Sequence, residues 1–270
     1  MKKVIITLLI VVLVLGIGTG GALFWGYSNA KTDKAYASKA NTLVSDYEKK
    51  YGDKWLDKNL TDDFTNEGNI VKAKEALGQA KTDAQNSLNE LNATKSSKRV
   101  ASVQKDAVDY FNITIKSLDN AINYYDYTKA LAKSTTSLES SGGQISSLAG
   151  AAAELTIAKN KIDTAISELE KVTPPDTLKE FHTAYIAELK KMSAALDGMI
   201  IALNAGDLTM LESYTNQLGV ISAEMVTLDI PSADEITKDI ISTDDQKKLD
   251  EIPGRLSTEA SKFNSKTFSF

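Results

Sequence analysis

His182 is the first residue to consider for chemistry, because it is the only imidazole in the chain. The sequence also has no Cys, so sites built from thiolates or from two imidazoles are excluded. His182 follows Phe181 and lies one helical turn from Tyr185 and Ile186. We expect it at the edge of a packed helix face. A pH-sensing role stays open, since the ordinary pKa of histidine is about 6.5.

Acidic side chains gather between Asp53 and Gly68, where oxygen ligands for calcium would be plentiful. The spacing from Asp63 through Glu67 and Gly68 loosely follows a calcium-binding loop. The twelfth position of such a loop needs Glu, but this sequence has Lys74 there. We therefore expect a solvated acidic connection, without a metal or another cofactor.

The aromatic side chains of one segment form a second candidate site. They are Tyr110, Phe111, Tyr124, Tyr125 and Tyr127. Tyr125 fits a helical core stripe, and we expect Tyr124 and Tyr127 to flank it. Aromatic residues beside a helix seam also line small-molecule pockets, so that alternative stays open. Neither reading supplies a catalytic residue, and we assign none.

The single His and the lack of a catalytic motif predict that the protein is not an enzyme, and composition predicts a globular chain. The 270 residues are 42% apolar and 25% charged, as in globular proteins, with a net charge of −5. This acidic balance disfavours nucleic acid as a partner. Only 4 Pro and 15 Gly interrupt the chain, which favours long regular elements.

The N-terminus contains an uncharged run from Val4 to Tyr27, preceded by Lys2 and Lys3. A helix of this length spans about 36 Å, enough for the ~30 Å hydrocarbon core of a bilayer. Trp25 and Tyr27 lie where aromatic rings prefer the membrane boundary. The glycines in this run resemble a dinucleotide fingerprint, but no strand precedes them. We expect residues 1–30 to form a membrane anchor.

Two fates of this segment stay open. It is an uncleaved anchor, with the N-terminus in the cytoplasm and the C-terminal domain outside, or a signal peptide cleaved near Ala30. Small residues at Ser28 and Ala30 suit the second reading, and the length of the apolar run favours the first. Both place the rest of the chain outside the cytoplasm.

The remaining chain has the three-and-four spacing of amphipathic helices. One apolar run comprises Ala73, Leu77, Ala80, Ala84, Leu88 and Leu91, and another comprises Val100, Val103, Ala107, Phe111, Leu118, Ala121 and Tyr125. A third comprises Leu208, Leu211, Thr215, Leu218, Ile221, Met225 and Leu228. These runs predict an all-α fold with coiled-coil-like packing. We expect an elongated antiparallel bundle of four to five long helices.

Helix breakers divide the chain into segments. Residues 31–68 form a juxtamembrane helix and the acidic connection, and residues 69–230 form the bundle. Within it we expect hairpins at 69–138 and 150–205 and a further helix at 207–228. Residues 231–270 add a short helix and a tail. Boundaries between these segments are expected at Pro174 and Pro175, at Gly206 and Asp207, and at Pro253 and Gly254. Asp176 or Thr177 is expected to cap the helix that begins after Pro175.

The two hairpins are related in pattern. One constant shift along the chain, without gaps, pairs Leu77 with Leu155, Glu90 with Glu168 and Leu118 with Leu196. Duplication of one hairpin is one explanation of this match; the alternative is that any two amphipathic hairpins slide into partial register. Neither hairpin can bury its stripe alone, so we expect the two hairpins to pack against each other.

These features predict a membrane-anchored helical bundle outside the cytoplasm that acts through protein or cell-envelope contacts. The alternative is a small-ligand-sensing or solute-binding ectodomain that works through a partner subunit. The outline resembles the helical ectodomains of chemoreceptors in architecture only, because no motif is shared. The sequence leaves the oligomeric state open.

Overall fold

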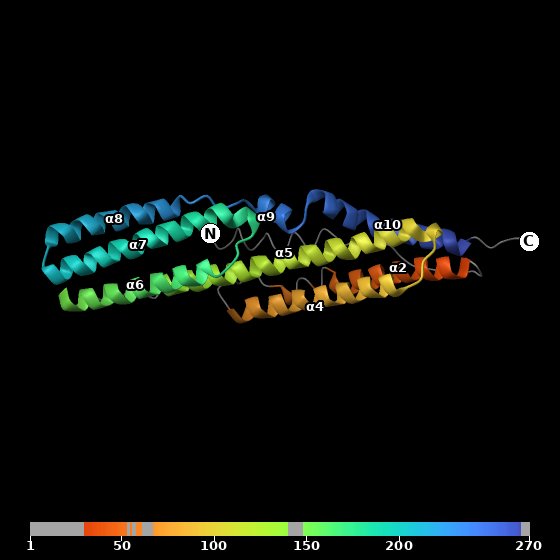
Figure 1. The fold of residues 1–270 in the computed structure, drawn as a ribbon, viewed down its shortest axis with the longest axis horizontal. Coiled ribbons are helices and arrows are strands. Elements are labelled where there is room, and N and C mark those ends of the chain that lie inside the picture. The colour runs from red at the N-terminus through yellow and green to blue at the C-terminus, as the bar shows by residue number, and fades with distance from the viewer. Residues whose placement is uncertain (1–29, 53–54, 56–57, 61–66, 140–147, 266–270) are drawn as a thin grey trace, which may run out of the picture. The chain divides into compact units, whose positions relative to one another are not determined.

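The computed structural model describes residues 30–52, 55, 58–60, 67–139 and 148–265 (Figure 1). Regular structure in these ranges is entirely helical, without a strand, which confirms the all-α class. No helix in the same ranges is both long and apolar enough to cross a bilayer. The run Val4–Tyr27 lies outside the described residues, as do Asp53 and most of the acidic connection.

The chain forms two compact units. Unit 1 comprises Met1–Ile122 and Ala233–Phe270, and unit 2 comprises Asn123–Ser232. The long helix α5 (Ala101–Glu139) belongs to unit 1 as far as Ile122 and to unit 2 from Asn123.

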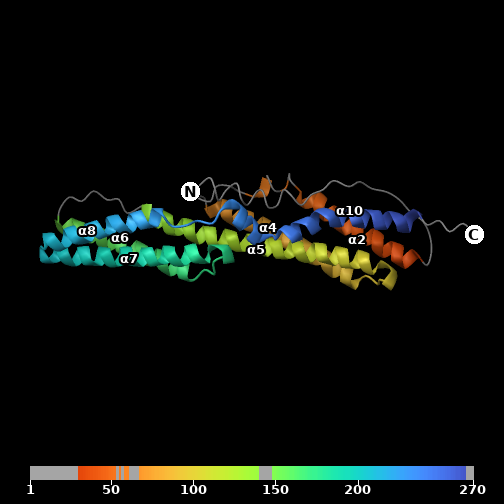
Figure 2. The same cartoon turned by 90° about the horizontal axis from the view of Figure 1, so that it is seen from above.

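Unit 1 is built on a hairpin that other helices cover. The hairpin consists of α4 (Glu67–Ala93), the short 3-10 helix η1 (Lys98–Val100) and the first part of α5. Its cover consists of α2 (Ala30–Tyr51), α9 (Ala233–Ile240) and α10 (Thr243–Ser265), and α2 packs beside α10 (Figure 2). The predicted apolar runs of α4 and α5 are buried from Ala73 to Leu91 and from Val100 to Tyr125.

Tyr47 joins three helices of unit 1. Its ring meets Tyr110 and Phe111 of α5 edge-on, with centroids 6.4 Å and 5.8 Å away. Its hydroxyl donates a 3.2 Å hydrogen bond to the carbonyl of Ala80 in α4. Such aromatic pairs contribute about 0.5–1.5 kcal/mol each beyond the area that they bury. Tyr47 therefore fixes how α2 sits on the hairpin.

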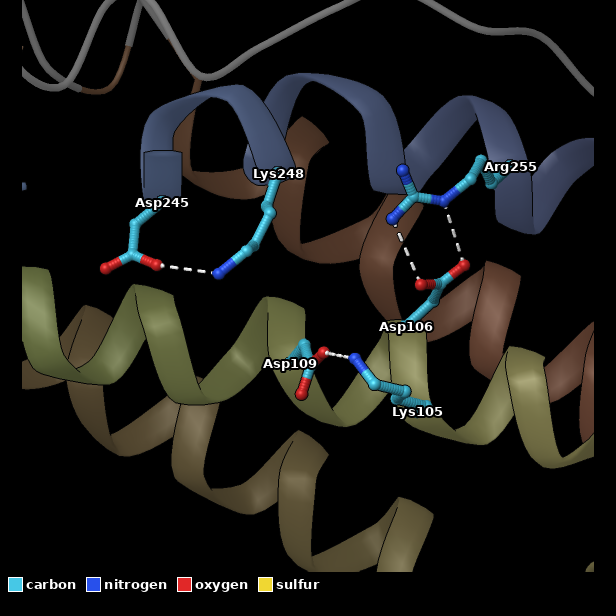
Figure 3. A network of polar contacts seen from close by, with 6 residues as sticks. All are labelled: Lys105, Asp106, Asp109, Asp245, Lys248 and Arg255. Carbon is cyan, nitrogen blue, oxygen red and sulfur yellow. Dashed lines mark hydrogen bonds and ion pairs between the residues drawn. The ribbon is translucent and has the colours of Figure 1, made fainter. Parts of the chain in front are cut away.

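Helix α10 corrects the expectation of a short helix and a tail in 231–270. It continues through Pro253, where the sequence predicts a boundary. Proline removes one helical hydrogen bond, but Ile252, Leu256 and Ala260 are buried on one side of α10 and offset that loss. Arg255 adds a two-pronged ion pair with Asp106 of α5, with both N–O distances 3.0 Å (Figure 3).

Unit 2 contains the rest of α5, α6 (Leu148–Glu170), η2 (Asp176–Leu178), α7 (Lys179–Ala205) and α8 (Leu208–Val226). Helix α7 lies between α6 and α8 and packs against both (Figure 1). Ser193 of α7 donates to Asp163 of α6 at 2.5 Å.

The turn between α7 and α8 confirms the predicted boundary. Gly206 has a φ of 70°, a left-handed conformation that glycine adopts without a steric cost. Asp207 then caps α8, because its side chain accepts a 2.9 Å hydrogen bond from the backbone N–H of Met210. The other predicted cap is wrong: α7 follows the turn η2 and has Leu178 as its N-cap, without a side-chain cap bond.

The element boundaries repeat at the same shift that relates the two hairpins in the sequence. This shift pairs Lys98, which begins η1, with Asp176, which begins η2. It likewise pairs Ala101, which begins α5, with Lys179, which begins α7. The hairpins α4–α5 and α6–α7 thus share their turn as well as their apolar pattern.

The ring of Tyr214 in α8 packs directly against Gly198 of α7. A Cβ atom placed there would overlap the ring of Tyr214 in α8. Glycine in a helix interior costs about 0.5–1 kcal/mol relative to alanine. Gly198 therefore lowers the intrinsic stability of α7 but leaves room for the Tyr214 ring.

We expect Gly198→Ala to lower the free energy of unfolding by about 1–3 kcal/mol, because the Tyr214 ring must move from its site. Gly78→Ala in α4 is the matched control, since no atom lies within 4 Å of its added Cβ. The control should gain up to about 1 kcal/mol. Urea denaturation measures both; equal gains would show that Gly198 has no packing role.

Candidate functional site

The outer surface of α8 is the most unusual feature of the described chain. Leu208, Val220 and Val226 are 70%, 58% and 80% exposed, and Ile201 on α7 is 54% exposed. Ile221 is the one buried residue of α8. Apolar side chains in water gain free energy when a partner covers them, by about 25 cal/mol per Å².

Charge also distinguishes α8 from a helix that faces water. Only Glu212 and Glu224 are charged among its 19 residues, and it has no Lys or Arg. Helix α10 is the internal comparison: it buries one side and carries nine charges in 23 residues. The exposed positions of α8 are therefore occupied by uncharged polar and small residues together with Leu208, Val220 and Val226. The composition of α8 therefore suits contact with another macromolecule better than contact with water.

Polar contacts hold α8 on α7 despite this shallow burial. Lys191 of α7 donates to Glu188 at 2.7 Å and to Glu224 of α8 at 3.0 Å. The bond from Lys191 lowers the pKa of Glu224, so this carboxylate stays ionised and paired. The pairing leaves Glu212 as the remaining charge on α8.

A shallow groove between α2 and α4 is the second candidate site. Its volume is ≈ 250 Å³, and Tyr47, Tyr51, Asp83 and Glu90 contribute to its lining. This volume lies below the roughly 300–1,000 Å³ of ordinary ligand pockets. The groove therefore has room for a small molecule only.

Asp83 is the polar centre of the groove. It accepts hydrogen bonds from Lys50, from the Tyr51 hydroxyl and, at 2.8 Å, from Gln79. Burial alone would raise the pKa of Asp83, but these donors outweigh it and lower that pKa. Burial, followed by the bond to Asp83, raises the pKa of Tyr51 to about 12. These groups satisfy one another, which leaves little polar capacity for a ligand.

The His182 ring packs edge-on against the ring of Tyr127, with centroids 5.6 Å apart, which is the packing role expected from the sequence. Burial lowers its pKa, so the neutral imidazole is favoured. Tyr124 and Tyr127, which were expected to flank the core, are as buried as Tyr125, because α5 is packed on more than one side. In the ranges with described structure, no three His, Asp or Glu side chains form a group able to hold a metal.

Sequence reasoning missed Glu48 of α2. Its Oε1 atom is buried and has no hydrogen-bond partner among the described residues. It faces the buried Tyr110 of α5, whose pKa rises through burial and then through the charge of Glu48. Burial raises the pKa of Glu48 to about 7. In the sequence, Glu48 directly follows the core residue Tyr47. Spacing alone does not distinguish a buried Glu at this position from a solvated one.

Comparisons with protein-family models, curated proteins and solved structures give no match to this chain.

We expect Glu48 to make stability depend on pH. Folding favours the protonated carboxyl of Glu48. Its contribution to the free energy of unfolding is therefore complete below about pH 4.5 and is lost as the pH rises through about 7. Glu48→Gln should remove this decline and stabilise the chain at pH 8 by about 1–2 kcal/mol, after allowance for solvent screening. Urea denaturation from pH 5 to 8 measures it.

The matched control is Glu75→Gln on the exposed side of α4. Its pH profile should parallel that of the unmodified chain. If Glu48→Gln and the control have the same profile, the Glu48 carboxyl is solvated and the assignment is wrong.

Proposed function

We propose that this protein is a non-catalytic helical bundle, tethered to the membrane and placed outside the cytoplasm, that acts by docking to protein through the outer surface of α8. The observation that carries the proposal is that α8 exposes the large apolar side chains of Leu208, Val220 and Val226 and carries only two charges. A protein partner that covers these apolar side chains would remove them from water, which is favourable.

The chemistry of α8 favours protein over the other partners. Phosphate-rich surfaces such as nucleic acid and anionic lipid attract Lys and Arg, and α8 has neither. Its exposed Leu and Val side chains, with Ser, Thr and Asn between them, match the mixed apolar and polar composition of protein interfaces.

The tether rests on the run Val4–Tyr27. Its length, its lack of charge and the aromatic residues at its end support a single span with the N-terminus in the cytoplasm. Cleavage near Ala30 is the alternative, and it would release the same bundle outside the cytoplasm.

We also infer that the hairpins α4–α5 and α6–α7 arose from one duplicated unit. The shared shift from η1 to η2, and from the start of α5 to the start of α7, supports this. In each copy the hairpin needs additional helices to cover its stripe, and α8 serves that purpose in unit 2. The outer surface of α8 then has no counterpart in the first copy of the duplicated unit.

A ligand-binding role is the second candidate function, and its site would be the groove between α2 and α4. The aromatic lining by Tyr47 and Tyr51 favours it. A bound metabolite would raise the melting temperature of the full chain, and Tyr51→Ala would remove that shift. A metabolite screen without any shift argues for the docking function alone.

Site-specific photo-crosslinking in intact cells tests the docking function. A photoreactive amino acid at position 226 of α8 should yield protein adducts, because the exposed Val226 lies on the proposed surface. The same amino acid at position 71 of α4, where an exposed Val71 is also replaced, is the matched control. We expect few adducts there.

A second variant links the adducts to the surface. Ser222→Glu, one turn before Val226 on the same side of α8, should abolish adducts at position 226 and change the free energy of unfolding by less than about 0.5 kcal/mol, as surface substitutions ordinarily do. Equal adducts at both positions, or adducts with lipid alone at position 226, would contradict the docking function.

A further inference from the structure

The turn between α4 and α5 gathers three cations in a chain whose net charge is −5. They are Lys95, Lys98 and Arg99, and all three are exposed. Within the described part of the chain, none of these three side chains forms a hydrogen bond or an ion pair. Residues 94–99 are called the basic turn below.

The nearest carboxylates along the chain do not neutralise the basic turn. Glu90, which precedes the turn, pairs with Lys39 of α2. Asp106, which follows it, accepts both bonds from Arg255 of α10. The positive charge of the turn therefore faces the surroundings, where it attracts anions.

Local contacts fix the backbone of the basic turn. The Ser97 hydroxyl accepts a 3.1 Å hydrogen bond from the backbone N–H of Arg99, which caps η1. Ser96 donates to Gln104 at 2.8 Å, and Val100 is fully buried beneath the turn. A partner that binds the cations does not have to order this backbone first, which favours binding.

The corresponding turn of unit 2 lacks this charge. The shift that relates the two hairpins aligns each cation with a residue that is not basic: Lys95 with Thr173, Lys98 with Asp176 and Arg99 with Thr177. Asp176 is itself paired with Lys179 at 2.6 Å. The hairpin turn therefore does not need cations in order to fold, so those of the basic turn suit an external partner.

The basic turn lies at the end of unit 1 where α2 begins. Helices α2 and α4 run antiparallel, because Lys50 pairs with Asp83 and, nearer the turn, Lys39 pairs with Glu90. The adjoining η1 contacts α2 (Figure 1). Helix α2 begins about 14 Å before Lys39 along its axis, and the run Val4–Tyr27 ends three residues before α2. A membrane span in that run would bring the turn close to the bilayer surface.

We propose that the basic turn docks on the bilayer surface beside the run Val4–Tyr27 and binds the phosphate groups of anionic phospholipids. The inference rests on the tether in the proposed function, because the run must enter the bilayer for the turn to lie against it. Each Lys or Arg at such a surface strengthens attachment by about fivefold, and salt weakens it. The acidic balance of the chain disfavours nucleic acid as the phosphate source. A second attachment beside the span would hold unit 1 in one orientation on the membrane.

Fluorescence quenching in vesicles that carry the full chain tests this contact. The chain has no Cys, so Ser96→Cys gives a single site for a dye in the basic turn. Lys72→Cys, at an exposed position about 30 Å away along α4, is the matched control site. The vesicles contain phosphatidylcholine alone or equal parts of phosphatidylcholine and phosphatidylglycerol. Both kinds include the same small fraction of a lipid with a quencher on its head group.

We expect quenching at position 96 to rise several-fold with phosphatidylglycerol and to fall back in high salt, whereas position 72 shows little in either vesicle. Replacing all three cations of the turn by Gln should remove the rise. The single change Lys98→Gln should reduce it, and Lys72→Gln, with the dye at position 96, should leave it unchanged. Melting curves verify folding and should not shift, because the three side chains have no partners among the described residues.

Equal quenching at position 96 in both vesicles, or a rise that survives removal of the three cations, would overturn the inference. An acidic protein would then be the partner that suits the charge of the turn. Extraction of the vesicles with alkali separates the tether from the lipid contact. If the chain resists extraction but position 96 shows no rise, the tether stands and the contact is wrong. If alkali releases the chain while the rise is present, the contact stands and the tether is wrong; release without a rise means that both are wrong.

Discussion

A two-helix hairpin with an apolar stripe cannot bury that stripe by itself, and both units of this protein are organised by that constraint. In unit 1, α2 and α10 cover the α4–α5 hairpin, with Tyr47 and Arg255 as the main cross-contacts. In unit 2, α7 packs between α6 and α8. Each covering helix exposes its other side to the surroundings, and the residues on that side determine what the helix can contact.

The covering helices of the two units, α10 and α8, have different outer surfaces. Helix α10 presents charged side chains, and its bonds from Arg255 to Asp106 and from Lys248 to Asp245 fix it to unit 1 and to itself (Figure 3). Helix α8 relies on Tyr214 against Gly198 and on one ion pair from Lys191 to Glu224. Its exposed side carries Leu208, Val220 and Val226 among mostly uncharged polar residues, where α10 carries charges. This contrast within one chain is the physical basis for assigning the interaction to α8.

Much of the fold follows from the three-and-four period, because burial of an apolar stripe leaves a repeating signal. The runs around Leu77 and Phe111 are buried as expected, and Gly206 and Asp207 mark a helix boundary through their backbone preferences. Pro253 misleads because local preference argues for a break, whereas Ile252 and Leu256 stabilise the helix through distant contacts. Such contacts involve residues far apart in the sequence, so a short stretch of sequence does not reveal them.

The candidate site was harder to predict for the same reason. The sequence shows an apolar run from Leu208 to Leu228 and predicts that it faces a core, yet the structure buries Ile221 and exposes Leu208. Helix α8 is apolar on several sides, so the period does not reveal which side finds an internal partner. The low charge of α8 was visible in the sequence, and its meaning depends on knowing that the outer side is exposed. Glu48 is similar, since only packing against Tyr110 distinguishes it from a solvated glutamate.

The most direct measurement of the central claim is the rate of thiol labelling at Val226→Cys in the native membrane and in the dilute purified chain. Lys72→Cys, at an exposed position of α4, is the reference. Coverage of α8 by protein predicts slow labelling at position 226 in the membrane and fast labelling after purification, with no change at position 72. Equal rates at position 226 in both preparations would contradict the account, because the surface of α8 would then face water in the cell.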